Sequence, residues 1–352
     1  MKKFFFSFLV ALTTLTANAQ KTDKQMATLQ HGDQTLVFYG INAFVEAYEA
    51  AADTLDVITL SSGEFNSPWN VSKSITVYGA GFEDDETTGT NRTFINNNIR
   101  LIPADAEDED GIIIKGVKHV NGIHLEGLDV WGGVHCDNNN DVPISNLSIV
   151  KCWLEGGLSF STQNNNCSIR QSVIGSNDNP GSIQGSYYNG NHTLAANLLI
   201  SNCWIGDVHS FNDASTIKVD HCICLYGGGS YEYTNNIMFG TPSNGAIARN
   251  NIFIGCEYTS DISESNWNNL ATAGVFAAEG EDGSYAADKD FALKYPKKHV
   301  GTDGTEIGLH GGTYAWNKIP LIPRITSYEL DTSNAANGTI KVSIKAEAQT
   351  KE

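Results

Sequence analysis

Five short segments of the sequence carry polar side chains whose types and spacing could do chemistry. They share an alternation of apolar and polar residues that is typical of β-strands, and they are GIIIKG (111–116), GGVHCD (132–137), GLSFS (157–161), GSIQGS (181–186) and DVHSF (207–211). If the apolar members point inward, the polar members that point outward are Lys115, His135, Asp137, Ser159, Ser161, Gln184 and His209. A carboxylate beside a basic group is the minimum for general acid–base catalysis or β-elimination. The same pair also describes an ordinary surface salt bridge, so both interpretations stay open.

A second set of segments shows which elements must position these side chains. Segments 147–156, 167–176, 198–207, 217–226, 231–240 and 246–255 alternate apolar residues on both sides of one small or polar residue, and 123–132 fits less well. This pattern predicts two short strands that meet at a tight bend. The bend residues are Leu128, Cys152, Ser172, Cys203, Cys222, Asn236 and Asn251. Units this short must stack to bury their apolar faces, which predicts a parallel β-helix.

Stacking of these units would bring the candidate residues of different segments together. Neighbouring strands in such a stack lie about 4.8 Å apart. That spacing predicts that Lys115 lies beside Asp137 and that His135 lies near Ser159.

The strand after each bend has an unusually apolar outward face. Its outward residues are Trp153, Val173, Trp204, Ile223, Ile237 and Ile252. An apolar ladder of this length exceeds what a monomeric protein normally shows to water. The favoured interpretation is that residues 257–330 fold back and cover it. The alternatives are that Trp153 and Trp204 stack on sugar rings, or that the stripe is an oligomer contact.

The segments that flank the repeats carry a resemblance to a known family. A strand TLVFYG (35–40) precedes a helix from about Asn42, with Phe44, Tyr48 and Ala51 or Ala52 on one face, and DVITLSSGEF (56–65) follows it. After the repeats comes GTDGTEIGLHGG (301–312). Together these features resemble secreted bacterial right-handed parallel β-helix proteins of the pectin lyase-like superfamily. The resemblance implies an all-β solenoid with an N-terminal capping helix, but no particular reaction, since this scaffold hosts lyases, hydrolases, epimerases and adhesins.

The order of segments along the chain predicts its organisation and its compartment. Residues 1–19 have the basic start, short apolar stretch and small-residue cleavage site of a secretory signal peptide. A secreted, periplasmic or outer-surface location is therefore expected, and no segment is apolar enough for a transmembrane helix. The N-cap and β-helix are predicted over 31–256, an irregular flanking segment over 257–300, and a C-terminal capping strand pair or β tail over 301–352.

Composition restricts the partners and cofactors. The formal charge is −18, or −20 without Lys2 and Lys3 of the signal, and it repels nucleic acid as well as polyanionic glycans. The 7 Cys are odd in number and lack zinc-site spacing, which predicts mostly buried apolar thiols. No cofactor is expected. The acidic runs 105–110 and 137–141 offer Ca²⁺ oxygen ligands, but solvated turns are the favoured interpretation.

Two functions of different classes follow from these observations. Pectate-lyase-like and polygalacturonase-like sites need carboxylates gathered on adjacent coils, and Asp137 has no such stacked neighbour. The favoured function is a secreted or cell-surface β-helix that binds a polysaccharide or cell-surface glycan without chemistry, and its expected contacts are Trp153, Trp204, Ser159, Ser161 and Gln184. The alternative is a polysaccharide lyase or glycoside hydrolase that acts in a groove on one face, with acid–base groups at Lys115, His135, Asp137 and His209.

Overall fold

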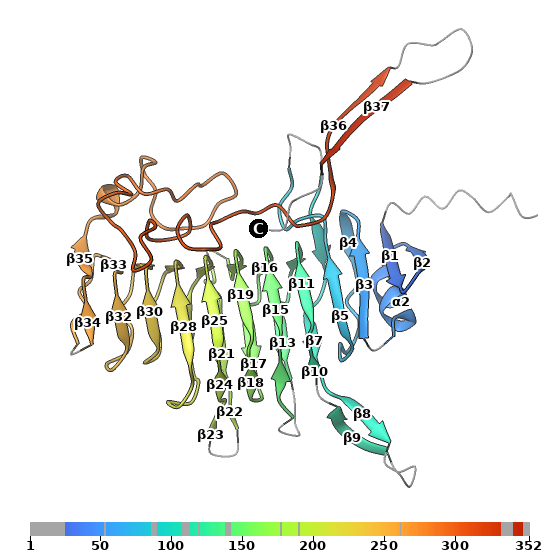
Figure 1. Ribbon diagram of the computed structural model, residues 1–352, viewed down its shortest axis with the longest axis horizontal. Coiled ribbons are helices and arrows are strands. Elements are labelled where there is room, and N and C mark those ends of the chain that lie inside the picture. Colours follow the sequence, from blue (N-terminus) through green and yellow to red (C-terminus); the bar gives the residue numbers. More distant parts are fainter. Residues whose placement is uncertain are drawn as a thin grey trace, which may run out of the picture.

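The computed structural model describes residues 25–347, except for residues 53, 86–89, 108–112, 119, 138–141, 177, 189–190, 261 and 332–340. The predicted signal peptide 1–19 lies outside the described residues. The described chain is a parallel β-helix whose strands stack along one long axis, as the repeat predicts (Figure 1). No described helix is long and apolar enough to cross a membrane.

Four sheets run along the axis, and we name them A to D. In stacking order, sheet A contains β2 (Gln34–Tyr39), β1 (Met26–His31), β3 (Thr54–Leu60), β5 (Ser74–Tyr78), β11 (His124–Glu126), β15 (Ser148–Val150), β19 (Ser168–Arg170), β25 (Leu198–Ser201), β28 (Ile217–Asp220), β30 (Glu232–Thr234), β32 (Ile247–Arg249) and β34 (Ser263–Glu264). Sheet B contains β4 (Gly63–Phe65), β6 (Thr93–Ile95), β12 (Asp129–Val130), β16 (Trp153–Leu154), β20 (Val173–Ile174), β26 (Trp204–Ile205), β29 (Ile223–Cys224), β31 (Ile237–Met238), β33 (Ile252–Ile254) and β35 (Trp267–Leu270). Sheet C contains β7 (Ile99–Leu101), β13 (Val134–Cys136), β17 (Leu158–Phe160), β21 (Ser182–Gly185) and β27 (Asp207–His209). Sheet D contains β10 (Val120–Asn121), β14 (Ile144–Ser145), β18 (Asn164–Asn165) and β24 (Ala195–Ala196).

Three antiparallel hairpins and a 3₁₀ turn interrupt or follow the coils. The hairpins are β8 (Ala104–Glu107) with β9 (Ile113–Lys118), β22 (Tyr187–Tyr188) with β23 (Asn191–His192), and β36 (Arg324–Asp331) with β37 (Lys341–Glu347). The 3₁₀ turn is η1 (Thr272–Gly274). The first and last of these hairpins project from the solenoid on different sides (Figure 1).

The bend between sheets A and B confirms the predicted repeat and refines it. The residue before each bend residue takes a left-handed conformation, for example Asn202 at φ 53° and Asn250 at φ 52°. The bend residue itself points inward and bonds to the next coil: the Cys222 backbone N–H donates to Asn236 Oδ1 at 2.7 Å. Asn236 and Asn251 are linked in the same way at 2.9 Å. Short polar side chains therefore satisfy the backbone where the two strands separate.

The cysteines lie where the repeat places them. All 7 are free thiols, and each is buried except Cys256, which is half-buried. Burial raises the pKa of the Cys152 thiol to about 12. These groups are packing residues of the core, as predicted.

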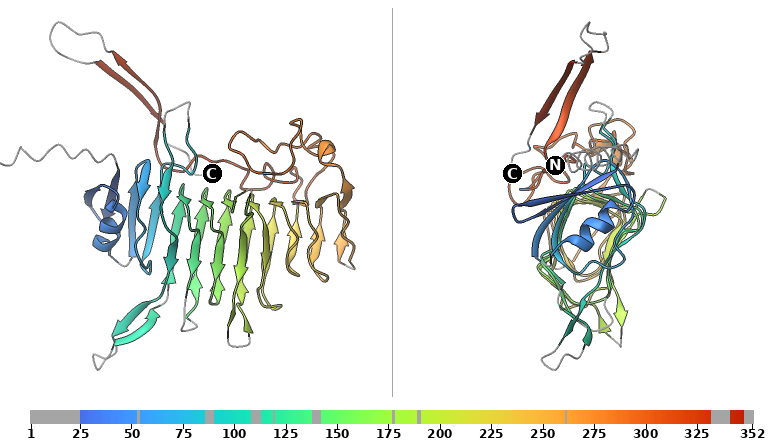
Figure 2. Two further views of the ribbon diagram at one scale, coloured as in Figure 1. Left: turned by 180° about the vertical axis from the view of Figure 1, so that it is seen from behind. Right: turned by 90° about the vertical axis from the view of Figure 1, so that its right-hand side faces the viewer.

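The two ends of the solenoid are closed in different ways. At the N-terminal end, α2 (Ala43–Ala50) lies across the first coil and buries Phe44 and Tyr48 on the predicted face (Figure 2). At the other end, Tyr258 stacks on Phe253 at 5.9 Å and fills the last coil. The predicted C-terminal strand pair is present as β36 and β37, which stand away from the coils as a β tail (Figures 1 and 2).

The segment after the last coil folds back over sheet B and covers the apolar ladder. Trp204, Ile223, Ile237 and Ile252 are fully buried there. Their cluster includes apolar side chains of the returning segment: Val275, Phe276, Tyr285, Phe291, Leu293, Ile307 and Leu309. The favoured interpretation of the ladder is therefore confirmed.

Residues 299–321 of this segment, which we call the strap, run back along the bend between sheets A and B. Left-handed residues that precede the bend residues bind it: Asn250 donates to the carbonyl of Val300, Asn202 to that of Leu309, and Gln171 to that of Ala315. The strap thus ties the last coils to the first ones (Figure 1).

Candidate functional site

The outward face of sheet C carries one continuous row of polar side chains. Strand pairing places Arg100, His135, Ser159, Gln184 and His209 in direct register. Four of these five were predicted, and the structure brings them together as expected. Each step along the row is about 4.8 Å, so His135 and His209, three strands apart, lie about 14 Å from each other. They cannot act on one bond together.

Lys115 does not belong to this row. It lies in β9, which pairs antiparallel with β8 in a hairpin outside the coil. The place beside Asp137 is taken by Arg100 of β7, whose Nε lies 3.0 Å from Asp137 Oδ2. The prediction of a Lys115–Asp137 pair is wrong because the hairpin interrupts the coil and displaces the lysine. The alternating segment around Arg100 was the signal that could have revealed the true partner.

His135 and Ser159 form a hydrogen-bonded pair whose proton positions can be assigned. His135 Nε2 lies 2.9 Å from the carbonyl oxygen of Gly132. Since a carbonyl can only accept, Nε2 carries a proton. In the neutral ring, Nδ1 then accepts a hydrogen bond from the Ser159 hydroxyl, 2.9 Å away. The pair is half-buried and lies on a strand face that is open to solvent.

The remaining predicted polar residues make weaker or local contacts. Ser161 Oγ lies 3.5 Å from Asp137 Oδ1. His209 bonds the adjacent Ser210 at 2.6 Å and lies 3.8 Å from Asp207. Asp137 is therefore held between Arg100 and Ser161, two residues along the chain from His135.

The two tryptophans predicted to stack on sugars are not placed to do so. Trp204 is completely buried, and its indole N–H donates to the carbonyl of Gly283 at 2.8 Å. The indole N–H of Trp153, which is half-buried, donates to Gly175 at 2.7 Å. Two other indoles are open to solvent: Trp69 is 80% exposed and Trp131 is 59% exposed. The sequence gives no local sign of this difference, because it depends on which coil the returning segment reaches.

These exposed indoles flank the N-terminal end of the polar row. The Arg100 guanidinium lies 5.9 Å from the centre of the Trp69 ring. Trp131 precedes the turn that supplies the Gly132 carbonyl, and it packs edge-to-face on Phe94 at 6.4 Å. The polar row of sheet C is therefore bordered by one open indole, Trp69, beside Arg100 and by a second, Trp131, at its edge with sheet B.

Sheet A carries a second serine–histidine pair that sequence reasoning missed. His124 Nδ1 lies 3.0 Å from Ser148 Oγ, and its Nε2 lies 3.2 Å from Glu126 Oε2. Glu126 is 4% exposed, and its other oxygen accepts the backbone N–H of Leu321 in the strap at 2.6 Å. The only sequence signal is a His-x-Glu on one outward strand face, in the coil that fits the repeat least well.

Metal ligation finds no support in the described part of the chain. No group of three or more His, Cys, Asp or Glu is arranged there to hold an ion. The acidic runs 105–110 and 137–141 fall partly outside the described residues, so the calcium prediction is not tested for them.

Comparison with known proteins adds no relative. A scan against protein-family models finds no match to this chain. Searches of curated proteins and of solved structures find no match either.

Proposed function

We propose that this protein is a secreted or cell-surface β-helix, related to the pectin lyase-like superfamily, that binds a polysaccharide along sheet C. The observation that carries the proposal is the in-register row from Arg100 to His209, flanked by the exposed Trp69 and Trp131. A polymer with a repeating backbone can meet one donor or acceptor on each coil. Indole rings offer an apolar face to sugar C–H groups while keeping a polar edge.

Charge supports a neutral or weakly charged glycan as the ligand. The chain carries a formal charge of −18, which repels polyuronates at low ionic strength. Within the row, Arg100 is paired with Asp137. The face therefore offers hydrogen bonds and stacking rather than a field that would attract a polyanion.

Binding is tested by affinity electrophoresis on gels that contain neutral or acidic polysaccharides. The wild type should be retarded by at least one neutral polymer, and the variant Trp69→Ala/Trp131→Ala should lose most of that retardation. Tyr295→Ala is the matched control, since Tyr295 is 53% exposed in the segment that covers sheet B. Equal retardation of the wild type and the double variant would remove sheet C as the binding face.

A lyase or hydrolase acting on the same face is the second candidate. The Arg100–Asp137 pair favours it, since it places a basic group and a carboxylate beside the row. A depolymerisation screen that follows both reducing ends and the absorbance of unsaturated products would detect either activity. Product formation that is lost in Asp137→Asn would support this function over binding alone, and silence across the glycans bound in the gels would oppose it.

A further inference from the structure

The sheet A pair differs from its sheet C counterpart in having a carboxylate as its third member. His124 and Glu126 project from the same face of β11, and Ser148 is in register with His124 on β15. We propose that Ser148, His124 and Glu126 form an acyl-transfer site that hydrolyses esters. Ser148 is the nucleophile, His124 is the general base, and Glu126 is the positioning residue that orients the ring. This site is separate from the glycan face on sheet C.

The hydrogen bonds assign the protons that such a site needs. An ionised Glu126 can only accept, so His124 Nε2 carries the proton in that bond. Nδ1 of the neutral ring is then free to accept the hydroxyl proton of Ser148. The Leu321 backbone N–H holds the second Glu126 oxygen, and the Tyr78 ring contacts His124 edge-on at 5.6 Å. Both contacts restrict the rotation of the carboxylate and the imidazole.

The reaction balances with these groups and water. Ser148 Oγ bonds to the ester carbonyl carbon while its proton passes to His124 Nδ1. The bond from that carbon to the alcohol oxygen then breaks, and the departing oxygen takes the proton from Nδ1. Water attacks the acyl-serine through the same nitrogen, which releases the acid and restores Ser148. Ser168 faces outward on the next strand in register with Ser148, on the side away from His124, where its hydroxyl can donate to the developing oxyanion.

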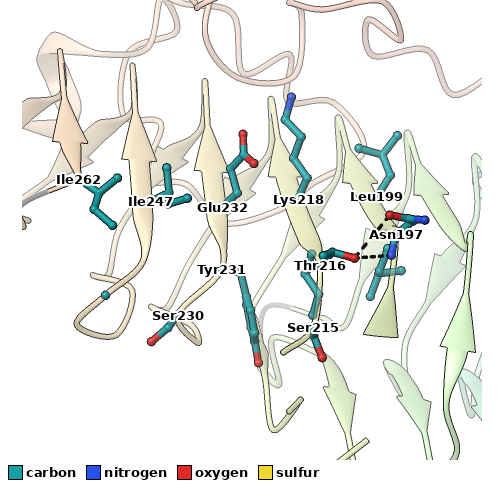
Figure 3. Close-up of a pocket in the computed structure, with 13 residues that line it drawn as sticks. Asn197, Leu199, Ser215, Thr216, Lys218, Ser230, Tyr231, Glu232, Ile247 and Ile262 are labelled. Carbon is teal, nitrogen blue, oxygen red and sulfur yellow. Dashed lines mark hydrogen bonds between the residues drawn. The ribbon is translucent and has the colours of Figure 1, made fainter. Parts of the chain in front are cut away.

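The row of outward side chains that contains Ser148 leads into a groove. The lining of this groove indicates which acyl group the substrate carries. Beyond Ser168, strand pairing continues the row through Leu199, Lys218, Glu232 and Ile247. A groove of about 450 Å³ lies over these strands (Figure 3). It begins two strands from Ser148, at a distance of about 10 Å.

The groove lining fits an extended apolar chain. Leu199 of β25, Ile247 of β32 and the 41% exposed Ile262, which precedes β34, line it (Figure 3). Lys218 and Glu232 lie between them, and their methylene stems add apolar surface while Lys218 Nζ reaches toward Asp220 at 3.6 Å. The substrate class is therefore an ester with a long unbranched acyl chain, whose carbonyl lies at Ser148 and whose tail lies in the groove.

Covalent labelling by an alkyl fluorophosphonate, which modifies activated serines, tests the nucleophile. The wild type should be labelled at Ser148, as located by peptide mass mapping. The label should disappear in Ser148→Ala and persist in Ser159→Ala, the matched serine of sheet C. Circular dichroism and the melting temperature of Ser148→Ala show whether the variant is folded. Absence of label at Ser148 in the folded wild type, or its persistence in Ser148→Ala, would overturn the site.

Chain-length dependence tests the substrate class. Hydrolysis of p-nitrophenyl laurate should exceed that of the acetate in kcat/KM, and Leu199→Asp, which places a charge at the start of the groove two strands from Ser148, should remove the preference. Equal rates for both esters in the wild type would overturn the acyl-chain assignment. Because Ser148 lies on sheet A, the glycan gels remain an independent measurement, and failure of either proposal is seen without the other.

Discussion

Two serine–histidine pairs bridge neighbouring coils on two different faces of this solenoid. Ser148 bonds His124 on sheet A, and Ser159 bonds His135 on sheet C, and the partners are 24 positions apart in the sequence in each case. The O···N distances are nearly equal, at 3.0 and 2.9 Å. The pairs differ in what holds the far nitrogen of the ring, which is the Glu126 carboxylate on sheet A and the Gly132 carbonyl on sheet C.

The same serine–histidine hydrogen bond therefore does not give the two pairs the same chemistry. Both acceptors hold the ring in the tautomer that leaves Nδ1 free to act as a base. Only the carboxylate also stabilises the positive charge that forms when the serine proton is transferred. The strap adds to this difference, because the backbone N–H of Leu321 donates to Glu126 and holds the carboxylate beside His124.

Replacing Glu126 by Gln should have the largest effect on the sheet A pair. The Gln amide N–H would donate to His124 Nε2, force the proton onto Nδ1 and deprive Ser148 of its base. Acylation of Ser148 should fall by roughly 10²–10⁴-fold, the range of a lost general base, as measured by the rate of fluorophosphonate labelling. His135→Gln on sheet C is the control and should leave that rate unchanged. An unchanged rate in Glu126→Gln would show that the carboxylate has no role.

A second test concerns Asp129, a buried carboxyl that lies beside the same bend as Glu126. Asp129 is fully buried and contacts Arg92 at 2.6 Å, and burial raises its pKa to about 7 despite that arginine, with Glu155 adding to the rise. A group with a raised folded pKa binds its proton more tightly in the folded state, so its stabilising contribution is complete below about pH 4 and is lost as the pH rises to about 7. The loss is at most about 4 kcal/mol, since each pKa unit corresponds to about 1.4 kcal/mol.

Urea denaturation of the wild type and Asp129→Asn across this pH range measures that contribution. The difference in unfolding free energy between the two proteins should change between pH 4 and 7 and remain constant above pH 7. Parallel stability curves would contradict the assigned pKa shift.

Loosening the strap should destabilise the protein more than removing an exposed asparagine of the same backbone conformation. The Asn202 side chain is buried and donates to the carbonyls of Leu309 and Gly311, each at 2.8 Å. Asn202→Gly keeps the left-handed backbone accessible but loses both bonds, which should cost about 2 kcal/mol at about 1 kcal/mol each. Asn197→Gly is matched in backbone conformation, with φ 60°, but is exposed and distant from the strap, so its effect should stay within about 0.5 kcal/mol. Thermal denaturation compares them, and equal losses would show that the strap contributes little.

Most of the fold was predictable because its determinants are local and repeated. Alternating apolar residues around each bend residue, such as Cys222 and Asn236, encode the stacking directly. The cover over Trp204 was predictable from the same pattern, since an outward apolar ladder needs a partner. The path of the strap was not predictable, because the hydrogen bonds that hold it end on backbone carbonyls such as that of Leu309. Backbone carbonyls are present in every residue, so these bonds leave no pattern in the residue types.

The candidate sites were predictable only where coils have regular lengths. His135 and Ser159 are separated by one uninterrupted coil, so their contact could be expected. Arg100 and His135 are separated by a coil that contains the β8–β9 hairpin, and the insertion led to Lys115 being placed in the wrong strand. His124 and Glu126 were missed because their outward position becomes informative only once Ser148 is known to lie in register.

The smallest expected effect is the difference between the two pairs in double-mutant cycles of stability. Single and double alanine variants of Ser148 with His124, and of Ser159 with His135, should each give a coupling energy of about 1 kcal/mol, as a neutral hydrogen bond does. The two values should agree within about 0.5 kcal/mol, the usual error of such cycles, because both pairs have the same geometry and are half-buried. A much larger coupling on sheet A would mean that Glu126 strengthens the pair in the resting state and serves stability. Equal coupling with unequal labelling would mean that the carboxylate acts only when charge develops on the ring, which is the property that separates a reactive pair from a structural one.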